Sequence, residues 1–201
     1  MIILIDNYDS FAYNLYQMLG SCLIETGADL DIRVVRNDQA TVAQLTAMRP
    51  SHLVISPGPG KPEDAGICVD AVKAFTGVAP VLGVCLGHQA ICLAYGAQVG
   101  HAARLRHGVG DLVNVDNRSP LFAGLPPTIQ AARYHSLAVA EASLPPSLRV
   151  TARADDEEVM AVQDATSAVF GVQFHPESIL TPQGSQVVRN FLSSSSCAER
   201  A

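Results

Sequence analysis

A single cysteine, Cys85, lies between an apolar segment and a segment of helical periodicity, in the run GVCLG. The pattern Gly-x-nucleophile-x-Gly is typical of a tight turn from a strand into a helix, where small flanking residues relieve crowding. Backbone N–H groups and the dipole at a helix N-terminus stabilise a thiolate, usually by about 0.3 to 1 kcal/mol. Free cysteine is also among the most buried residue types. The pentapeptide alone therefore leaves two interpretations of Cys85 open, a nucleophile and a core residue.

A histidine and a glutamate follow a second apolar run, VFGVQFHPES. We predict a strand here that ends at Phe174 and brings His175 and Glu177 to its carboxyl end. Active sites gather at that edge in open parallel sheets. Each residue alone is compatible with a structural role or a solvated loop. Together with a cysteine at the end of another strand, they favour a nucleophile, a base and an orienting acid.

The stretch LVISPGPGKPEDAG predicts a strand that ends at Ser56, followed by a tight, rigid loop whose backbone can approach a ligand closely. Lys61 after Gly60 suggests a phosphate-binding loop, but Pro62 stands where such loops need serine or threonine. We therefore reject nucleotide binding here. A backbone N–H of this loop, together with that of Leu86, can instead stabilise an oxyanion, an interaction worth about 3 to 4 kcal/mol in comparable sites.

These motifs need a scaffold of strands and helices. In the first half, β-branched runs alternate with segments of helical period, which predicts βαβ units and a parallel sheet with helices on both faces. Ser10 and Thr41 are expected to cap the first two helices. The expected strands are 2–6, 31–37, 53–56 and 81–85, and the expected helices are 11–23, 41–48 and 65–76.

The second half changes to strands separated by turn-rich segments, which predicts antiparallel pairs and a return to the main sheet. We expect one domain over residues 1–193, and a frayed tail over 194–201. The expected strands are 111–116, 130–136, 137–141, 148–154, 159–163 and 169–174, and the last helix is 183–193.

Composition limits the class of protein. The chain has 201 residues, 48% of them hydrophobic and 16% charged, which suits a globular domain with a sizeable core. Its net charge of −6 argues against binding to nucleic acid or to an anionic membrane. Five scattered cysteines without a CxxC pair, and an N-terminus without an export signal, predict a cytoplasmic protein. No histidine spacing indicates a metal site on this chain.

The three motifs, with DNYDSF near the start and RYHSL at 133–137, resemble the class I (triad-type) glutamine amidotransferases. The likeness runs over nearly the whole chain and is greatest to the small subunits of anthranilate synthase and aminodeoxychorismate synthase. It implies an α/β sandwich of three layers, around a mixed, mainly parallel central sheet.

The resemblance also implies roles for individual residues. Cys85 would attack the amide carbon of L-glutamine, His175 would act as base and then acid, and Glu177 would orient His175. Backbone amides would hold the oxyanion, and other residues would grip the α-amino and α-carboxylate groups. The residues implied to bind the substrate are Gly58, Pro59, Gly60, Leu86, Gln89, Ser136 and Leu137.

Ammonia released into water at neutral pH is mostly protonated, so the acceptor must lie close by. The resemblance implies a separate partner chain, a chorismate-using synthase that requires magnesium, and no cofactor on this chain. Relatives usually carry lysine after His-Gly in the region that reads RLRHGVGDLV, where Val109 follows His107 and Gly108. This departure suits either neutral drift or a different synthase, such as an aminodeoxyisochorismate-type enzyme. Two further alternatives are a stand-alone cysteine γ-glutamyl hydrolase and a non-catalytic regulatory subunit.

Overall fold

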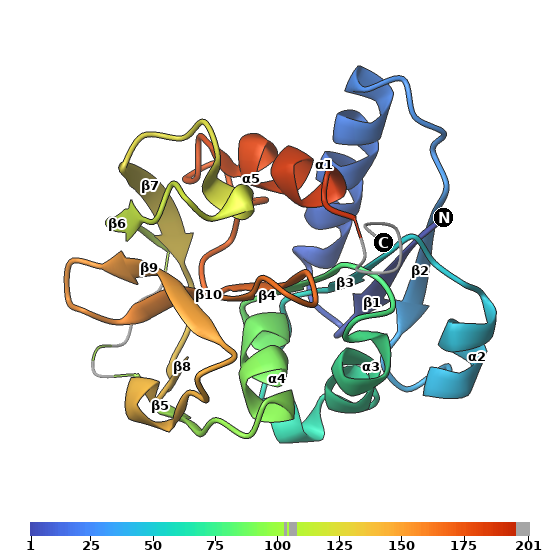
Figure 1. Cartoon of the computed structure of the whole chain (residues 1–201), viewed down its shortest axis with the longest axis horizontal. Coiled ribbons are helices and arrows are strands. Elements are labelled where there is room, and N and C mark those ends of the chain that lie inside the picture. The colour runs from blue at the N-terminus through green and yellow to red at the C-terminus, as the bar shows by residue number, and fades with distance from the viewer. Residues whose placement is uncertain (103, 105–107, 196–201) are drawn as a thin grey trace.

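The computed structural model describes residues 1–102, 104 and 108–195. Within them, nine strands form one mixed sheet (Figure 1). Their order across the sheet is β2 (Ile32–Arg36), β1 (Ile2–Asp6), β3 (His52–Ile55), β4 (Val81–Val84), β11 (Val169–Val172), β10 (Val159–Asp164), β9 (Arg149–Ala154), β6 (Val109–Val115) and β7 (Thr128–Arg133). All pairings from β2 to β11 are parallel, and all pairings from β11 to β7 are antiparallel. The mixed α/β sheet predicted from the sequence is therefore confirmed.

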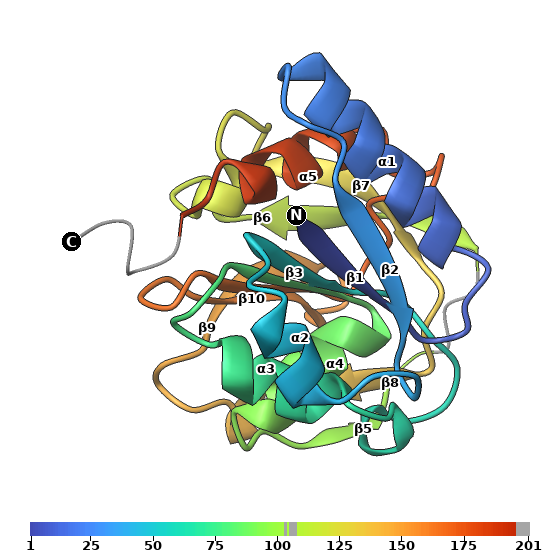
Figure 2. The same ribbon diagram turned by 90° about the vertical axis from the view of Figure 1, so that its right-hand side faces the viewer.

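Helices cover both faces of the sheet, as Figures 1 and 2 show from two sides. On one face lie α1 (Ala12–Glu25) and α5 (Gly184–Leu192). On the other lie α2 (Val42–Ala47), α3 (Cys68–Phe75) and α4 (Leu86–Ala94). A small antiparallel sheet of β5 (Val99–His101) and β8 (Leu137–Val139) lies beside α4. Short 3-10 turns occur at Pro62–Asp64, Pro120–Phe122 and Glu141–Ser143.

The first strand, β1, shows why the strands in the parallel part of the sheet have uninterrupted apolar sequences. Side chains alternate between the two faces of a strand. Ile2 and Leu4 belong to the hydrophobic cluster on the α1 and α5 side, whereas Ile3 and Ile5 belong to the cluster on the α2 to α4 side. Because both faces are covered, every position of the strand is buried.

The two predicted helix caps have opposite outcomes. Thr41 caps α2 through a capping box with Gln44, as expected. The prediction for Ser10 is wrong, because α1 follows Phe11 and has no side-chain cap. Asp9 accepts the hydrogen bonds at this helix start instead. Its Oδ1 accepts from the N–H of Phe11 (2.7 Å), and its carbonyl accepts from the N–H of Ala12 (3.1 Å).

Other differences concern element boundaries. The sequence pattern did not predict β5, and β11 ends at Val172 instead of Phe174. Most of the proposed tail, from 196 onward, lies outside the described residues.

No helix in the described part of the chain is both long and apolar enough to cross a bilayer.

Two glycines allow the turn between β4 and α4 to close. A Cβ on Gly83 would lie 2.3 Å from the carbonyl oxygen of Gly87, and a Cβ on Gly87 would lie 2.4 Å from that of Ile55. Both obstacles are backbone atoms, which cannot move aside as a side-chain tip can. The flanking glycines of GVCLG are therefore required by close packing of the helix start on the sheet.

Replacing Gly83 by alanine tests this requirement. We expect Gly83→Ala to lower the free energy of unfolding by about 1 to 3 kcal/mol, the usual cost of overpacking, in urea denaturation. Gly100→Ala is the matched control, because nothing lies within 4 Å of the added Cβ there. Its effect should stay within about 0.5 kcal/mol. Equal stability of the two variants would contradict the steric account.

Candidate active site

Cys85 occupies a left-handed backbone conformation between β4 and α4, with φ 52° and ψ −102°. This region is rarely adopted by residues other than glycine. The N–H of Cys85 donates to the carbonyl of Val172 at the end of β11 (2.8 Å), which fixes the turn against the neighbouring strand. The residue directly precedes the first turn of α4, where backbone N–H groups lack intrahelical acceptors. The geometry is that of a strand-to-helix nucleophile turn.

Cys85 lines a pocket of about 320 Å³. All seven residues proposed to bind the substrate line the same pocket, together with Asp9, Tyr134 and His135. The four segments that line this pocket follow β1, β3, β4 and β7 in the chain. The described structure therefore brings the predicted nucleophile and the predicted binding residues together around one space.

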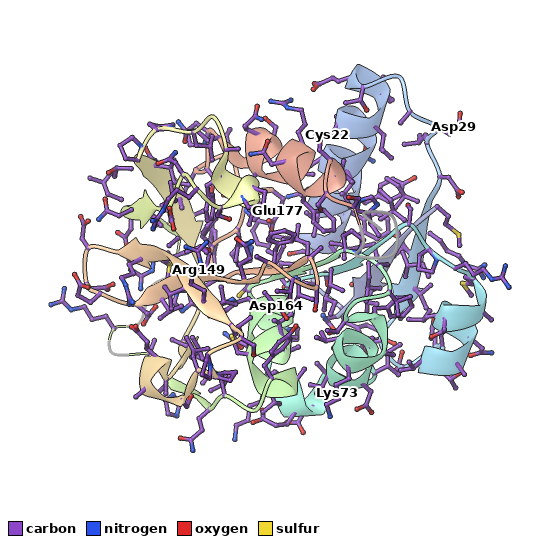
Figure 3. The ribbon with its side chains drawn as sticks, viewed as in Figure 1. Cys22, Asp29, Lys73, Arg149, Asp164 and Glu177 are labelled. Carbon is purple, nitrogen blue, oxygen red and sulfur yellow. The ribbon has the colours of Figure 1, made fainter. Side chains whose placement is uncertain are left out.

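His175 and Glu177 form a buried pair behind Cys85. His175 Nδ1 lies 2.6 Å from Glu177 Oε1, and the side chains are 3% and 0% exposed. Glu177 lies in the interior of the molecule (Figure 3). In the described part of the chain, His175 Nε2 has no hydrogen-bond partner. A carboxylate at Nδ1 therefore leaves Nε2 as the ring atom for proton exchange.

The segment that carries His175 is held from several sides. Its N–H donates to the carbonyl of Ala132 (3.0 Å) at the edge of β7. Thr181 donates to the carbonyl of His175 (2.7 Å) and accepts from the N–H of Ala132 (2.9 Å). The rings of Phe11 and Tyr134 pack against the imidazole, with centroids 5.5 Å and 5.1 Å away. These contacts define both the position and the tilt of the imidazole.

Electrostatics favours a charged His175. Burial disfavours the imidazolium, but the interactions with Cys85 and then Glu177 outweigh it and raise the pKa of His175 above its usual value. A protonated His175 beside Cys85 is the arrangement that supports a thiolate nucleophile.

The loop at 58–60 is fixed by an amide network from β1. Asn7 donates its N–H to Ser56 Oγ and its side-chain amide to the Ser56 carbonyl, both at 2.9 Å. Asn37 donates to Asn7 Oδ1 (2.8 Å). A Cβ on Gly58 would lie 2.5 Å from the Cβ of Asn7 and 2.6 Å from Leu86 Cδ2. Glycine at 58 thus lets the loop lie close to both the network and the start of α4.

The pocket is also lined by the segment that leads from β7 into the start of β8. Gln89 Nε2 donates to the carbonyl of Leu137 (2.9 Å), which ties α4 to this segment. His135 Nδ1 also lies near the carbonyl of Leu137 (3.1 Å). Burial, and then the positive charge of Arg133, lower the pKa of His135 to about 4, so its ring is neutral at pH 7. His135 therefore lines the pocket as a neutral ring beside the Leu137 carbonyl.

Arg133 is the charged support behind this segment. Its side chain is 1% exposed and pairs with Asp111, Asp156 and Glu158 at 3.0, 3.1 and 2.7 Å. His135 Nε2 lies 3.3 Å from the same Glu158 oxygen. The network joins β6, β7 and the turn before β10 to the segment that lines the pocket.

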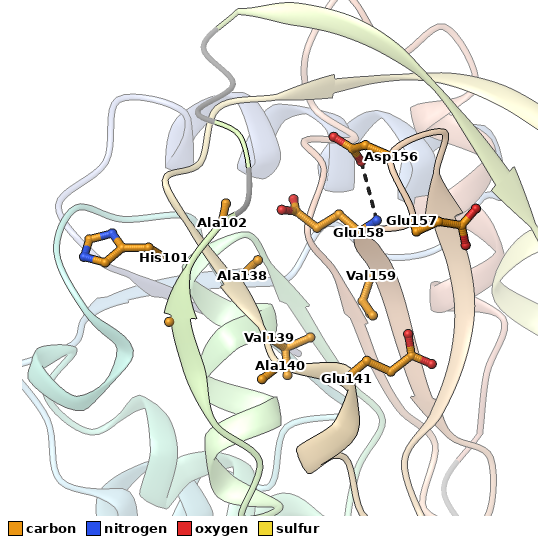
Figure 4. Close-up of a pocket in the computed structure, with 11 residues that line it drawn as sticks. His101, Ala102, Ala138, Val139, Ala140, Glu141, Asp156, Glu157, Glu158 and Val159 are labelled. Atoms are coloured by element: carbon orange, nitrogen blue, oxygen red, sulfur yellow. Dashed lines mark hydrogen bonds between the residues drawn. The ribbon is translucent and has the colours of Figure 1, made fainter.

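A second pocket, of about 280 Å³, is lined in part by Ala138 and Val139 of β8 (Figure 4). Four of its lining residues are acidic, namely Glu141, Asp156, Glu157 and Glu158. Cys85, His175 and Glu177 do not line it. The pocket at Cys85 is therefore the candidate substrate site.

Several functional residues escaped sequence reasoning. Phe11 and Tyr134 flank His175, and Asn7 supports the 58–60 loop. Gln173 lies between the nucleophile and Gln89, with Nε2 3.6 Å from Cys85 Sγ. These residues lie in or beside the DNYDSF, RYHSL and VFGVQF stretches, so the only available signal was their nearness to the quoted motifs.

Other sequence predictions concern positions away from the pocket. Val109 begins β6 opposite Arg133, whereas His107 lies outside the described residues. Cys92 is buried in the core. Among the described residues, no group of three or more His, Cys, Asp or Glu side chains is arranged to hold a metal ion.

Comparison with known proteins identifies the family. The family model "Glutamine amidotransferase class-I" matches residues 3–194, so the chain belongs to the class I glutamine amidotransferases. A solved structure from Thermoplasma acidophilum, described as a component of GMP synthase, is similar to this chain. It has a TM-score of 0.79 and 26% identity, with coverage of 99% of this chain and 94% of that one.

Curated relatives are more similar in sequence. The chain is 46% identical to aminodeoxychorismate synthase component 2 of Escherichia coli, over 96% of this chain and 99% of that protein. It is 45% identical to the aminodeoxychorismate/anthranilate synthase component 2 of Bacillus subtilis, over 96% and 95%. It is 50% identical to the bifunctional protein TrpGD of Thermotoga maritima over 95% of its own length, but spans only 32% of that longer protein.

The charge on His175 gives a testable pH dependence. We expect Cys85→Ser and Glu177→Gln each to lower the pKa of His175, because each removes an interaction that favours the imidazolium. NMR titration of the ring measures the shift, and His52, at the opposite end of β3, is the internal control. An unchanged His175 pKa in both variants would contradict the proposed pairing.

The same shift sets the pH range of its effect on stability. The folded-state pKa, about 10, lies above the ordinary histidine value near 6.5. The contribution of His175 to folding is therefore complete below about pH 6.5 and is lost as the pH rises through about 10.

Proposed function

We propose that this chain is the glutaminase subunit of a two-component synthase that uses chorismate. The observation that carries the proposal is the pocket in which Cys85, beside the buried His175–Glu177 pair, meets the 58–60 loop and Gln89. The proposed reaction hydrolyses L-glutamine to glutamate and passes ammonia to the partner chain. The proposed setting is the cytoplasm.

The first half of the reaction forms a thioester. The sulfur of Cys85 attacks the side-chain amide carbon, and the carbonyl oxygen becomes an oxyanion. Backbone amides at 58–60 and at Leu86 stabilise that oxyanion. His175 gives its proton to the leaving nitrogen, ammonia departs, and a glutamyl thioester remains on Cys85.

The second half releases glutamate. His175, now neutral, takes a proton from water, which attacks the thioester carbon and passes through a second oxyanion. The carbon–sulfur bond breaks, glutamate leaves, and the thiolate–imidazolium pair is restored. Glu177 keeps the proton-carrying ring in one orientation through both halves, because it is hydrogen-bonded to Nδ1.

The α-amino and α-carboxylate groups of glutamine need partners at the far end of the pocket. We assign them to Gln89 and to Ser136 and Leu137, which line the same pocket as the 58–60 loop. The bond from Gln89 to the Leu137 carbonyl joins these two elements into one surface. The neutral ring of His135 supports that surface without adding charge to it.

The partner is assigned from the relatives. Two proteins that match nearly end to end carry the name component 2, which supports a separate chain as the ammonia acceptor. We propose anthranilate synthase component II as the main function, with magnesium bound on the partner chain. Aminodeoxychorismate synthase is the second candidate, because the Bacillus subtilis relative is named for both products.

Cys85→Ser in the reconstituted complex is the direct test. With the chorismate-using partner present, glutamine-dependent product formation should fall by at least about 10³-fold, the usual scale of losing a nucleophile, while ammonium salts still support the reaction. Anthranilate fluorescence and chromatography of aminodeoxychorismate identify the product. Cys22→Ala, in α1, is the matched thiol control and should retain activity. Normal use of glutamine by Cys85→Ser would exclude Cys85 as the nucleophile and leave a non-catalytic, regulatory role for the chain.

Dependence on the partner separates this function from a stand-alone hydrolase. We expect the purified chain alone to hydrolyse glutamine slowly and the partner chain to accelerate it, because docking organises the loops around Cys85. Glutamate release with and without the partner is the measurement. A rate that is unchanged by the partner would favour the γ-glutamyl hydrolase.

A further inference from the structure

Gln173 is a buried polar residue at the site to which the proposed reaction gives no role. It follows β11, is 0% exposed, and its backbone N–H donates to the carbonyl of Met160 (2.8 Å). Its side chain lies beside the nucleophile, with Nε2 3.6 Å from Cys85 Sγ. Polar side-chain atoms that are buried in a protein nearly always have a hydrogen-bond partner.

A backbone carbonyl determines which way the amide of Gln173 faces. The carbonyl of Leu137 can only accept, so the group of Gln89 that lies 2.9 Å away must be its NH₂. The same NH₂ lies 3.1 Å from Gln173 Oε1, so that end of Gln173 must be the accepting oxygen. The NH₂ of Gln173 is then turned toward the sulfur. The opposite orientation would place two NH₂ groups together and a carbonyl oxygen against a thiolate.

We propose that Gln173 is a positioning residue that donates an N–H to the Cys85 sulfur and so stabilises the thiolate. The proposal rests on the proposed role of Cys85 as the nucleophile. It adds a neutral donor on the β11 side to the helix N-terminus of α4 and the charged ring of His175. A neutral donor stabilises the anion without competing for the proton that His175 must transfer.

The chain of amides also reaches the substrate end of the pocket. Gln89 Nε2 donates to both Leu137 and Gln173, so its remaining polar atom is an acceptor. An acceptor suits the α-ammonium group of an amino acid. One chain of hydrogen bonds thus sets both the donor that faces the sulfur and the acceptor type of Gln89.

The pH dependence of Cys85 alkylation by iodoacetamide tests the proposal in the full chain. Gln173→Met keeps the length of the side chain but removes the donor, and Gln173→Glu places an oxygen against the sulfur. We expect the midpoint of the rate profile to rise by about 1 pH unit in Gln173→Met, the usual size for one bond to a charged group, and further in Gln173→Glu. Mass spectrometry of the Cys85 peptide separates this site from the other thiols.

Gln163→Met is the matched control. Gln163, in β10, is also a buried glutamine of the central sheet. Unlike Gln173, its side chain accepts a hydrogen bond from Ser119 Oγ (2.6 Å). Its replacement should leave the alkylation midpoint unchanged. Circular dichroism of all variants confirms that each is folded. Folded Gln173 variants with the wild-type midpoint would overturn the proposal, and so would a slower rate without a shift, which indicates a steric role alone.

Steady-state kinetics in the partner complex gives a second readout. A donor to the thiolate should affect kcat, so Gln173→Met should lower kcat for glutamine with little change in KM, whereas a purely substrate-binding role would raise KM. Alkylation needs neither glutamine nor the partner. If the wild-type complex fails to use glutamine although the alkylation midpoint shifts in the Gln173 variants, the proposed function fails and the inference on Gln173 stands. If the wild-type complex uses glutamine but the midpoint does not shift in the variants, the inference on Gln173 fails and the proposed function stands.

Discussion

The left-handed backbone of Cys85 is the constraint on which the rest of the site depends. A non-glycine residue in this region costs about 1 to 3 kcal/mol and persists only where its surroundings hold it. Here the N–H of Cys85 is bonded to Val172, and Gly83 and Gly87 allow α4 to start directly on the sheet. The strain turns the sulfur into the pocket at a helix N-terminus. The packing of the sheet thus holds the proposed nucleophile in the lining of the pocket.

Strand order supplies the partners of that atom. Because β4 and β11 are neighbours in parallel register, the residues that follow β11 lie beside the turn that follows β4. The chain then crosses to β7, where the bond from His175 to Ala132 and the hydroxyl of Thr181 fix its path. The parallel part of the sheet therefore positions Cys85, and the junction with the antiparallel part fixes His175.

Local patterns and tertiary contacts were predictable to different degrees. The sequence sufficed for the parallel strands and for the cluster of Cys85, His175 and Glu177, because apolar runs and turn residues are local signals and parallel strands share a carboxyl edge. Gln173 was not predicted as part of the site, because a glutamine near a strand end shows neither which neighbour it faces nor the orientation of its amide. The buried Arg133 network was also missed, since it joins β6, β7 and the turn before β10, and no local pattern encodes that meeting.

The two walls of the pocket are held by different physical interactions. Neutral amides fix the 58–60 loop through Asn7, whereas the segment at 134–137 rests on an ionic layer around Arg133. A buried ion network adds little net stability, but breaking it by removing one partner is costly, so it holds one geometry. The wall to which we assign the α-amino and α-carboxylate groups is therefore the one that rests on the ionic network. The 58–60 loop, to which we assign the oxyanion contacts, follows a segment that is held by hydrogen bonds between uncharged groups.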